Sequence, residues 1–494
     1  MSDSKSGADA HRLILRGSRS AALGLVIRLG ARLLFLWFAA RLFGATLFGA
    51  YSVAVAVVEV GVIVGGLGTK RILFKLLDED DSGRPPVHVV LDAAAAVLVA
   101  SLAIAVLVMA TVGLLPRQGH AGETETALLL IAPMIAGQAL LDLFGAATRW
   151  KHRMRYDVIS RSICEPYAAI LAVLAAWALG FREMGLLVSY WAGTLAGLAY
   201  ALWGVRRCYG GFALGTYQVS WAKIRAIVHG NSLATLNDFL NGGFARLDLF
   251  FVGLLLGEAP AGVYGMARQL RTPIRQVRQS FDGLLAPMIS RTLAESSAVE
   301  TGLATASATR LILAIQLPLL LTLAMIGWPL LAWLGPEFAA GYLAMVMLAA
   351  AETIQGAFGV NDLILLYRRP RLALSVTCTS AAVSFIGGWL LVLQWGIDGA
   401  ALAVLLAWIA GALVRRAALR RTLGSAAPLM HSAGPLAAAS LAAIAGASIL
   451  RWGPADTAGY ALATAAALAV YALALWLWLR AAGQTLKLVN FRAG

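Results

Sequence analysis

Long apolar stretches follow one another along almost the whole chain, separated by short polar connectors. An α-helix needs about 20 mainly apolar residues to cross the hydrocarbon core of a membrane. Long continuous runs of this kind differ from the short alternating segments of a membrane β-barrel. The pattern therefore predicts an all-α integral membrane protein with 14 transmembrane helices, at approximately 20–41, 48–69, 87–115, 126–148, 158–180, 185–205, 225–255, 260–287, 305–334, 339–367, 371–395, 397–419, 431–452 and 457–479.

Basic residues gather in every second connector, as at Arg149–Arg155 and Arg415–Arg421. Short basic connectors favour the cytoplasmic side of a membrane. This alternation places both termini in the cytoplasm. Composition agrees, because 60% of the 494 residues are hydrophobic and only 13% are charged. The net charge of +15 is spread over connectors, so it does not indicate a nucleic-acid partner.

The chain also repeats itself. Residues 42–54 align without gaps to 255–267, and Gly44, Gly49 and Tyr51 match Gly257, Gly262 and Tyr264 at one offset. Six spans separate the copies, so both copies have the same orientation in the membrane, a parallel repeat found in transporters. The prediction is a pseudo-two-fold pair of six-helix lobes around a central cavity, with two extra C-terminal helices. The predicted parts are a cytoplasmic tail 1–19, an N-lobe 20–210, a cytoplasmic connector 211–224, a C-lobe 225–424, two further spans in 425–480 and a cytoplasmic tail 481–494.

Four arginines, followed by Asp282, share one face of the predicted eighth span. Their spacing of three or four residues puts them within an arc of roughly 80°. If residues 260–287 lay on the membrane surface, the later basic connectors would face outside, against the charge rule. The arginines therefore face protein or water inside the membrane, and Pro273 should bend the helix. We call this set the arginine stripe: Arg268, Arg271, Arg275 and Arg278.

Other polar residues in the predicted spans have two readings each. Arg28 and Arg32 share a face of the first span, where they either bind phosphate or pair with Glu59 or Asp92. Side chains on one face of the seventh span suit sugar hydroxyls, or else hold helices together. These are Asn237, Asn241 and Asp248.

Lone carboxylates in the spans are candidates for carrying a coupling proton or sodium ion, although pairing with a basic neighbour is the alternative for each. The three candidates are Glu59, Asp142 and Glu352, and Glu165 and Asp362 are further carboxylates of this kind. The three cysteines form no CxxC pair and the six histidines are scattered. Hence neither a catalytic group, a metal site nor a cofactor is predicted.

Two segments carry a family resemblance: RLFGATLFGAYSVAVAVVEVGVIVGGLGTKRIL at 41–73 and RLDLFFVGLLLGEAPAGVYGMARQL at 246–270. With GPEF before span ten and GIDGAAL before span twelve, they resemble the polysaccharide-biosynthesis exporters, the Wzx-type flippases of the MOP superfamily. The resemblance implies two lobes in a V that work by alternating access. It further implies a bacterial inner-membrane protein that moves an oligosaccharide on polyprenyl pyrophosphate to the periplasmic leaflet, for O-antigen, capsule or exopolysaccharide.

On this resemblance the arginine stripe binds pyrophosphate and acidic sugars. The alternative is that some of the four arginines pair with Asp238, Asp248 or Asp282, or extend to the lipid headgroups. The expected partners are the lipid-linked oligosaccharide, membrane lipids and other polysaccharide-assembly proteins. Two alternatives stay open. One is a membrane polymerase or ligase that uses the same substrate. The other is a peptidoglycan-precursor flippase, which Arg28 and Arg32 echo only in part.

Overall fold

A computed structural model describes residues 3–80, 83–114, 122–212, 214–243, 246–281, 298–423, 430–454 and 456–481. All regular elements in these ranges are helices. In α1 the side chains are described from Ile27 on. The tail predicted for 1–19 is helical from Asp3, and most of the predicted C-terminal tail lies outside the described ranges.

The chain divides into two compact units. Unit 1 comprises Met1–Arg246 with Gly257–Gly262, and unit 2 comprises Leu247–Leu256 with Val263–Gly494. Unit 1 contains α1 (Asp3–Gly65), α2 (Thr69–Asp78), α3 (Pro86–Leu114), α4 (Gly122–Ile131), α5 (Met134–Trp150), α6 (Arg155–Ile159), the π-helix η1 (Ser160–Cys164), α7 (Glu165–Ala178), α8 (Gly185–Tyr209), η2 (Leu214–Thr216), α9 (Trp221–Gly230), α10 (Ser232–Asp238) and the π-helix η3 (Phe239–Gly243). Unit 2 contains α11 (Leu247–Leu256), most of α12 (Glu258–Leu270), a helix at 272–281, α14 (Ala298–Leu334), η5 (Pro336–Gly341), α15 (Tyr342–Phe358), α16 (Asn361–Arg368), α17 (Pro370–Leu423), α18 (Met430–Trp452) and α19 (Thr457–Ala481).

Nine helices in the described ranges are long and apolar enough to cross a membrane, or ten if the bent pair α4 and α5 is one span. The predicted class, an all-α membrane protein, is therefore confirmed, whereas the number of 14 spans stays a prediction. Two of the nine are longer than one crossing needs, at 39 and 52 residues. They are interrupted at Gly44 (φ 72°) and Gly396 (φ 59°), each between two predicted spans. Glycine tolerates these backbone angles because it has no Cβ.

The continuous helix predicted for 225–255 is wrong. This stretch is divided among α9, α10, η3 and α11, and only α11 is a short apolar helix. The consecutive glycines Gly242 and Gly243 lie at the end of η3, where they weaken helical backbone. This interruption of the predicted helix coincides with the boundary between the two units, which follows Arg246.

The bend predicted at Pro273 is confirmed as an interruption. Helix α12 ends at Leu270, Arg271 forms a turn, and helical structure resumes at 272–281. A proline lacks the backbone N–H, and its ring clashes with the carbonyl four residues earlier. At the turn, the N–H of Ile274 donates to the carbonyl of Arg271 at 3.1 Å, a spacing of three residues instead of four.

Two glycines of the sequence repeat pack directly against each other within unit 1. A Cβ on Gly49 would lie 1.8 Å from the carbonyl oxygen of Glu258, and one on Gly262 would lie 1.9 Å from that of Ala45. The contact is reciprocal, because Ala45 and Glu258 also match at the repeat offset. The matched glycines Gly44 and Gly257 both have positive φ, at 72° and 90°. These positions support the predicted repeat.

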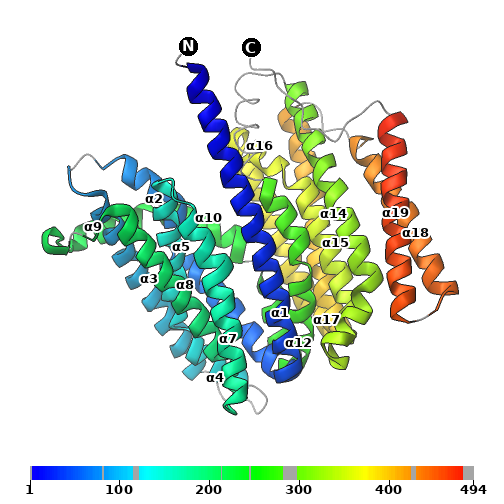
Figure 1. The fold of residues 1–494 in the computed structure, drawn as a ribbon, viewed down its shortest axis with the longest axis horizontal. Coiled ribbons are helices and arrows are strands. Elements are labelled where there is room, and N and C mark those ends of the chain that lie inside the picture. The colour runs from blue at the N-terminus through cyan, green and yellow to red at the C-terminus, as the bar shows by residue number, and fades with distance from the viewer. Residues whose placement is uncertain are drawn as a thin grey trace. The chain divides into compact units, whose positions relative to one another are not determined.

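Each unit has its own packed apolar interior. In unit 1, helices α3, α5 and α8 enclose Ala93, Leu143 and Val205, and α9 packs on α3. In unit 2, α18 and α19 lie side by side and pack against α14 (Figure 1). There the hydroxyl of Tyr471 donates to the carbonyl of Ala314 at 3.2 Å. These helix bundles hold the polar groups described next.

Candidate functional site

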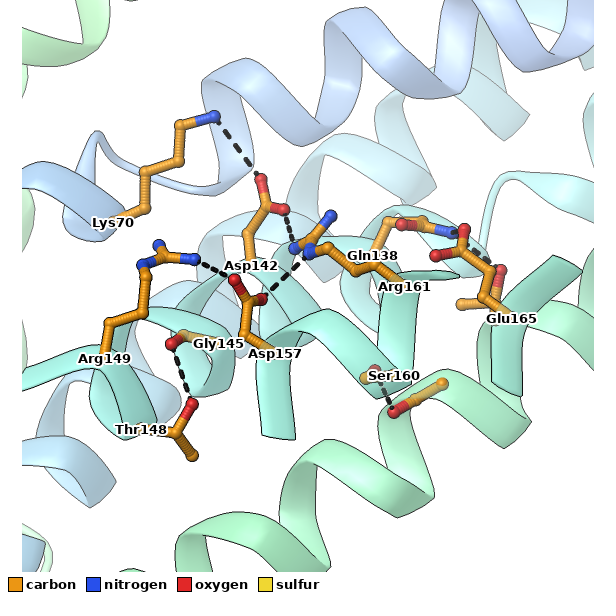
Figure 2. Close-up of polar contacts among 12 residues, drawn as sticks. Lys70, Gln138, Asp142, Gly145, Thr148, Arg149, Asp157, Ser160, Arg161 and Glu165 are labelled. Carbon is orange, nitrogen blue, oxygen red and sulfur yellow. Dashed lines mark hydrogen bonds and ion pairs between the residues drawn. The ribbon is translucent and has the colours of Figure 1, made fainter. Parts of the chain in front are cut away.

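A chain of alternating charges runs between α2, α5, α6 and η1 inside unit 1, and we call it the ionic ladder: Lys70, Asp142, Arg149, Asp157 and Arg161 (Figure 2). Arg161 joins the two carboxylates, because it pairs with Asp142 and its Nε lies 3.2 Å from Asp157 Oδ1. Arg149 pairs with Asp157, and Lys70 Nζ lies 3.6 Å from Asp142 Oδ2. The ladder contains three basic and two acidic groups.

Local sequence explains how the ladder is assembled. Asp157, Arg161 and Glu165 are four residues apart, so they follow one face of the segment from α6 to α7. Pro166 cannot donate a backbone hydrogen bond, and a wider π turn at η1 precedes it. On α5, a Cβ at Gly145 would occupy the position of Asp157 Oδ1, so glycine leaves room for this carboxylate (Figure 2).

Beyond the ladder, Glu165 meets neutral groups. Gln138 Nε2 donates to Glu165 Oε1 at 3.1 Å and to Thr194 Oγ1 at 2.9 Å. Arg28 on α1 is half-buried and interacts electrostatically with Arg161 and Glu165. Its Nε is buried without a hydrogen-bond partner. The polar chain thus extends from α2 to α1 through the interior of unit 1.

A pocket of about 300 Å³ opens beside Lys70 and Asp142. Asp238 and Arg246 also line it, so its charged groups are two basic and two acidic side chains. Arg246 Nε lies 2.6 Å from Glu59 Oε2. The apolar and backbone part of the lining includes Val62, Ile63, Gly66, Gly68, Thr69, Ala139 and Gly242. The pocket suits a neutral polar or zwitterionic group better than a strongly charged one.

In unit 2 the arginine stripe begins with a hydrogen-bonded carboxylate. Arg268 Nε lies 3.5 Å from Asp248 Oδ2. The fully buried Tyr264 donates its hydroxyl proton to the same oxygen at 2.9 Å, and the N–H of Leu249 donates to the other oxygen at 2.8 Å. Asp248 is therefore held by two hydrogen-bond donors and one ion pair from α11 and α12.

The turn residue of the stripe, Arg271, is deeply buried. Its Nε lies 3.4 Å from Glu352 Oε1, and both side chains are about 5% exposed. Arg275 and Arg278 are half-buried on the helix at 272–281. A Cβ at Gly359 would lie 2.3 Å from a terminal nitrogen of Arg278, so that guanidinium packs over this glycine. Asp282, the last charge of the predicted face, lies outside the described ranges.

All three carboxylates predicted as ion-coupling candidates have arginine partners: Glu59 with Arg246, Asp142 with Arg161 and Glu352 with Arg271. Their contacts therefore match the alternative expected for each of them, pairing with a basic neighbour.

Asp92, offered as a partner for Arg28 and Arg32, instead lies 2.5 Å from Arg84 and accepts from Tyr217 at 3.1 Å. Burial alone would lower the pKa of Arg84, but hydrogen bonds to Asp80 and Asp92 raise it above its ordinary value.

The polar face predicted for the seventh span does not form. Asn237 lies in α10 and Asn241 in η3, whereas Asp248 lies in α11. The break at the consecutive glycines removes the single helix on which the three residues would share a face. The two asparagine side chains are outside the described set, and Asp248 bonds to Arg268 and Tyr264.

Sequence reasoning missed Arg161 and Asp157, the centre of the ionic ladder. A signal was present, because Asp157, Arg161 and Glu165 follow one another at intervals of four residues within an apolar stretch. That spacing indicates one helical face. Gln138 offered no comparable signal, since its contact with Glu165 depends on how α5 packs against α7.

Comparison with known proteins gives a family and a fold. Residues 14–293 match the family model described as polysaccharide biosynthesis protein, which is more than half of the chain. No curated protein sequence matches the chain.

Among solved structures, an inward closed conformation of the lipid II flippase MurJ matches with a TM-score of 0.75 at 12% identity. It covers 94% of this chain and all of that one. An inward-facing multidrug resistance MATE family transporter of the MOP superfamily matches with a TM-score of 0.60 at 15% identity, over 80% of this chain and 99% of that one. A mutant of the Vibrio cholerae MATE transporter VcmN matches with a TM-score of 0.54 at 16% identity, over 84% and 98%. At these identities the likeness concerns the fold.

Proposed function

Because the chain belongs to the polysaccharide biosynthesis protein family and has the fold of MOP-superfamily transporters, we propose that it is a lipid-linked oligosaccharide flippase. The proposed cargo is an oligosaccharide on polyprenyl pyrophosphate, for O-antigen, capsule or exopolysaccharide. The proposed direction is from the cytoplasmic to the periplasmic leaflet of a bacterial inner membrane. Fourteen spans, cytoplasmic termini and alternating access between two lobes are part of the same proposal.

The arginine stripe is the observation that carries this proposal. Guanidinium groups bind phosphate oxygens in a bidentate manner and keep their charge when buried. Arg268 and Arg271 now pair with Asp248 and Glu352. When such an arginine leaves its carboxylate and binds a phosphate, its positive charge is still paired with a negative group. Arg275 and Arg278 extend the same surface toward the end of the described helix. Four guanidinium groups that follow one another every three or four residues suit a large anionic head group.

In the proposed cycle the stripe captures the pyrophosphate and the adjacent sugars, and the polyprenyl chain stays in lipid. Arg28 and Arg32 add positive charge from α1. The polar pocket of unit 1, with Asp142 and Arg246, offers hydrogen bonds to sugar hydroxyls. Rocking of the two lobes then exposes the head group to the periplasm. Transport needs no covalent step.

The test is transport of a fluorescent polyprenyl-pyrophosphate oligosaccharide by full-length protein in proteoliposomes. Replacing Arg271 alone would leave Glu352 buried without its partner. The informative variant is therefore Arg271→Gln with Glu352→Gln, which removes both charges, combined with Arg275→Gln. We expect at least a tenfold loss of transport at unchanged protein yield.

Arg420→Gln provides a matched control, because Arg420 is an exposed arginine near the end of α17. It should transport like the wild type. Full transport by the stripe variant would refute the assigned binding surface, and no transport by the wild type would refute the proposed cargo.

A peptidoglycan precursor is the second candidate cargo, because the lipid II flippase matches this fold over its full length. Adding unlabelled lipid II to the proteoliposome assay separates the two. Stronger competition by unlabelled lipid II than by the unlabelled oligosaccharide lipid would favour the second candidate. Formation of longer sugar chains in the same vesicles would instead favour the alternative of a polymerase or ligase.

A further inference from the structure

Glu165 differs from the other carboxylates in the interior of the described spans. Glu59, Asp92, Asp142, Asp157 and Glu352 each have an arginine within ion-pair distance. Among the side chains that the structure describes, no basic group lies within that distance of Glu165, and its hydrogen bond comes from the neutral amide of Gln138. The remaining carboxylates of these spans lie in a first turn or beside the interruption at Gly396. A glutamate without an ion pair is unusual in such a location.

Glu165 also lies near the middle of its helical span. The span that contains it runs from Arg155 to Ala178, so it is ten residues from one end and 13 from the other. At 1.5 Å per residue it is about 15 Å from the start of the helix. An ionised carboxylate at such a depth is costly unless it is paired, whereas its protonated form is not.

The surroundings allow both forms. Gln138 on α5 and Thr194 on α8 are neutral hydrogen-bonding groups. The charged or titratable groups that interact with Glu165 are Arg161 on its own segment, Arg28 and Tyr51 on α1, Asp142 on α5 and Tyr190 on α8. Arg161 is engaged by Asp142 and Asp157. The basic group that remains adjustable is therefore Arg28.

Arg28 is positioned to interact with Glu165. Helix α1 packs against both η1 and α7, the elements that carry Arg161 and Glu165. The buried Nε of Arg28 has no hydrogen-bond partner, and the guanidinium interacts electrostatically with both residues. A buried guanidinium nitrogen without an acceptor costs free energy. Glu165 in its ionised form and an anionic group of a cargo are two acceptors that would remove this cost.

We propose that Glu165 is the proton-exchanging group of this transporter and that its protonation releases Arg28 to an anionic group of the cargo. The proposal rests on the proposed flippase function for the cargo, but proton binding itself does not require it. Ionised Glu165 attracts Arg28. When one proton binds to the carboxylate, its charge falls from −1 to zero, Gln138 keeps its hydrogen bond to the carbonyl oxygen, and Arg28 turns to phosphate. Release of the proton reverses the exchange.

The proton itself is the probe in the decisive experiment. Infrared difference spectra of the purified full-length protein, recorded while the pH is lowered, detect the carbonyl stretch of a newly protonated carboxyl group. We expect such a band in the wild type and its loss in Glu165→Gln. Arg28→Gln should move the midpoint of the band upward by about one pH unit or more, because an opposite charge nearby favours the ionised form.

Two further variants serve as controls. Glu352→Gln combined with Arg271→Gln removes a buried glutamate together with its ion-pair partner, so neither charge is left unpaired, and this variant should keep the band. Glu165→Asp keeps a carboxyl group at this position and should keep a band. The loss of the band in Glu165→Gln then follows from the missing carboxyl group and not from disturbed folding.

Persistence of the band in Glu165→Gln would overturn the proton site, and an unmoved midpoint in Arg28→Gln would overturn the exchange. Failure of oligosaccharide transport by the wild type would refute the proposed cargo but leave these spectra unchanged.

Discussion

At the scale of single residues, two of the buried arginines, Arg271 and Arg415, are compensated by carboxylates from other helices. Arg415 pairs in a bidentate manner with Asp362, at 2.5 and 3.0 Å, and Arg271 pairs with Glu352. A buried pair of this kind adds little net stability, but removing one partner leaves an uncompensated charge. The pairs therefore fix which helices are neighbours more than they raise stability.

Arg415→Ala should lower the stability of the purified protein by about 2 kcal/mol, less than the cost of breaking a fully buried pair, because Asp362 is half exposed. The measurement is the thermal midpoint in detergent. Arg420→Ala changes an exposed arginine of the same helix and should leave the midpoint unchanged. Equal midpoints for both variants would show that the pair is energetically unimportant.

Tyr217→Phe should destabilise the docking of the connector before α9 by about 1 kcal/mol, since it removes the hydrogen bond to Asp92. Burial, together with Asp92, raises the pKa of Tyr217 from 10.0 to about 12. The neutral phenol is thus favoured by the folded state. Its contribution is present below pH 10 and is lost as the pH rises to about 12. Thermal midpoints across that window should fall more in the wild type than in the variant.

The sequence predicted which residue types carry charge in the membrane, but not most of their partners. Partners one helical turn apart are visible in a sequence, as for Asp157 and Arg161. Arg246 and Glu59 are 187 residues apart, and only helix packing brings them together. For the same reason the sequence identifies the coupling candidates Glu59, Asp142 and Glu352 but not the arginines that pair with them.

At the scale of helices, glycines and prolines decide where a long apolar stretch breaks. The interruption at Pro273 was predictable because proline removes a hydrogen bond wherever it lies in a helix. The break around Gly242 was not, because glycines are frequent in membrane helices and do not by themselves end one. Gly49 acts differently: its missing Cβ allows one backbone to touch another.

Gly49→Ala should therefore be much more harmful than its size suggests. The added Cβ would overlap the backbone of Glu258, which cannot move aside as a side chain would. We expect a loss of about 3 kcal/mol, measured as a thermal midpoint, or failure to purify as a monodisperse species.

Gly113→Ala is the matched control, since a Cβ there meets nothing within 4 Å. It should be neutral or raise stability slightly, because alanine favours helix. If Gly49→Ala were equally stable, the close contact would not exist in solution.

At the scale of the whole molecule, apolar run length was enough to predict the class, an all-α membrane protein. The order of weak motifs pointed to the family that the chain belongs to. Neither feature determines how many helices cross the membrane, because the apolar runs continue on both sides of the interruptions at Gly44 and Gly396. The charge alternation supplies the missing information, and it makes the topology testable.

Reporter fusions test the proposed topology. Alkaline phosphatase is active only outside the cytoplasm, so fusions after Glu183 and Trp452 should be active. Fusions after Gly210 and Arg421 should be inactive, while green fluorescent protein at those two positions should fluoresce. An active phosphatase after Arg421, with an inactive one after Gly210, would mean an odd number of crossings between them and would refute the parallel repeat.

The reciprocal contact of Gly49 and Gly262 has a consequence for the engineering of the gene. Each copy of the repeat supplies one of two surfaces that fit only while both lack a side chain. A side chain added to either copy at this point would overlap the backbone of the other. A chimera that joins halves from two relatives should retain 44–49 and 257–262 from a single parent, since a mismatch there disrupts the joint.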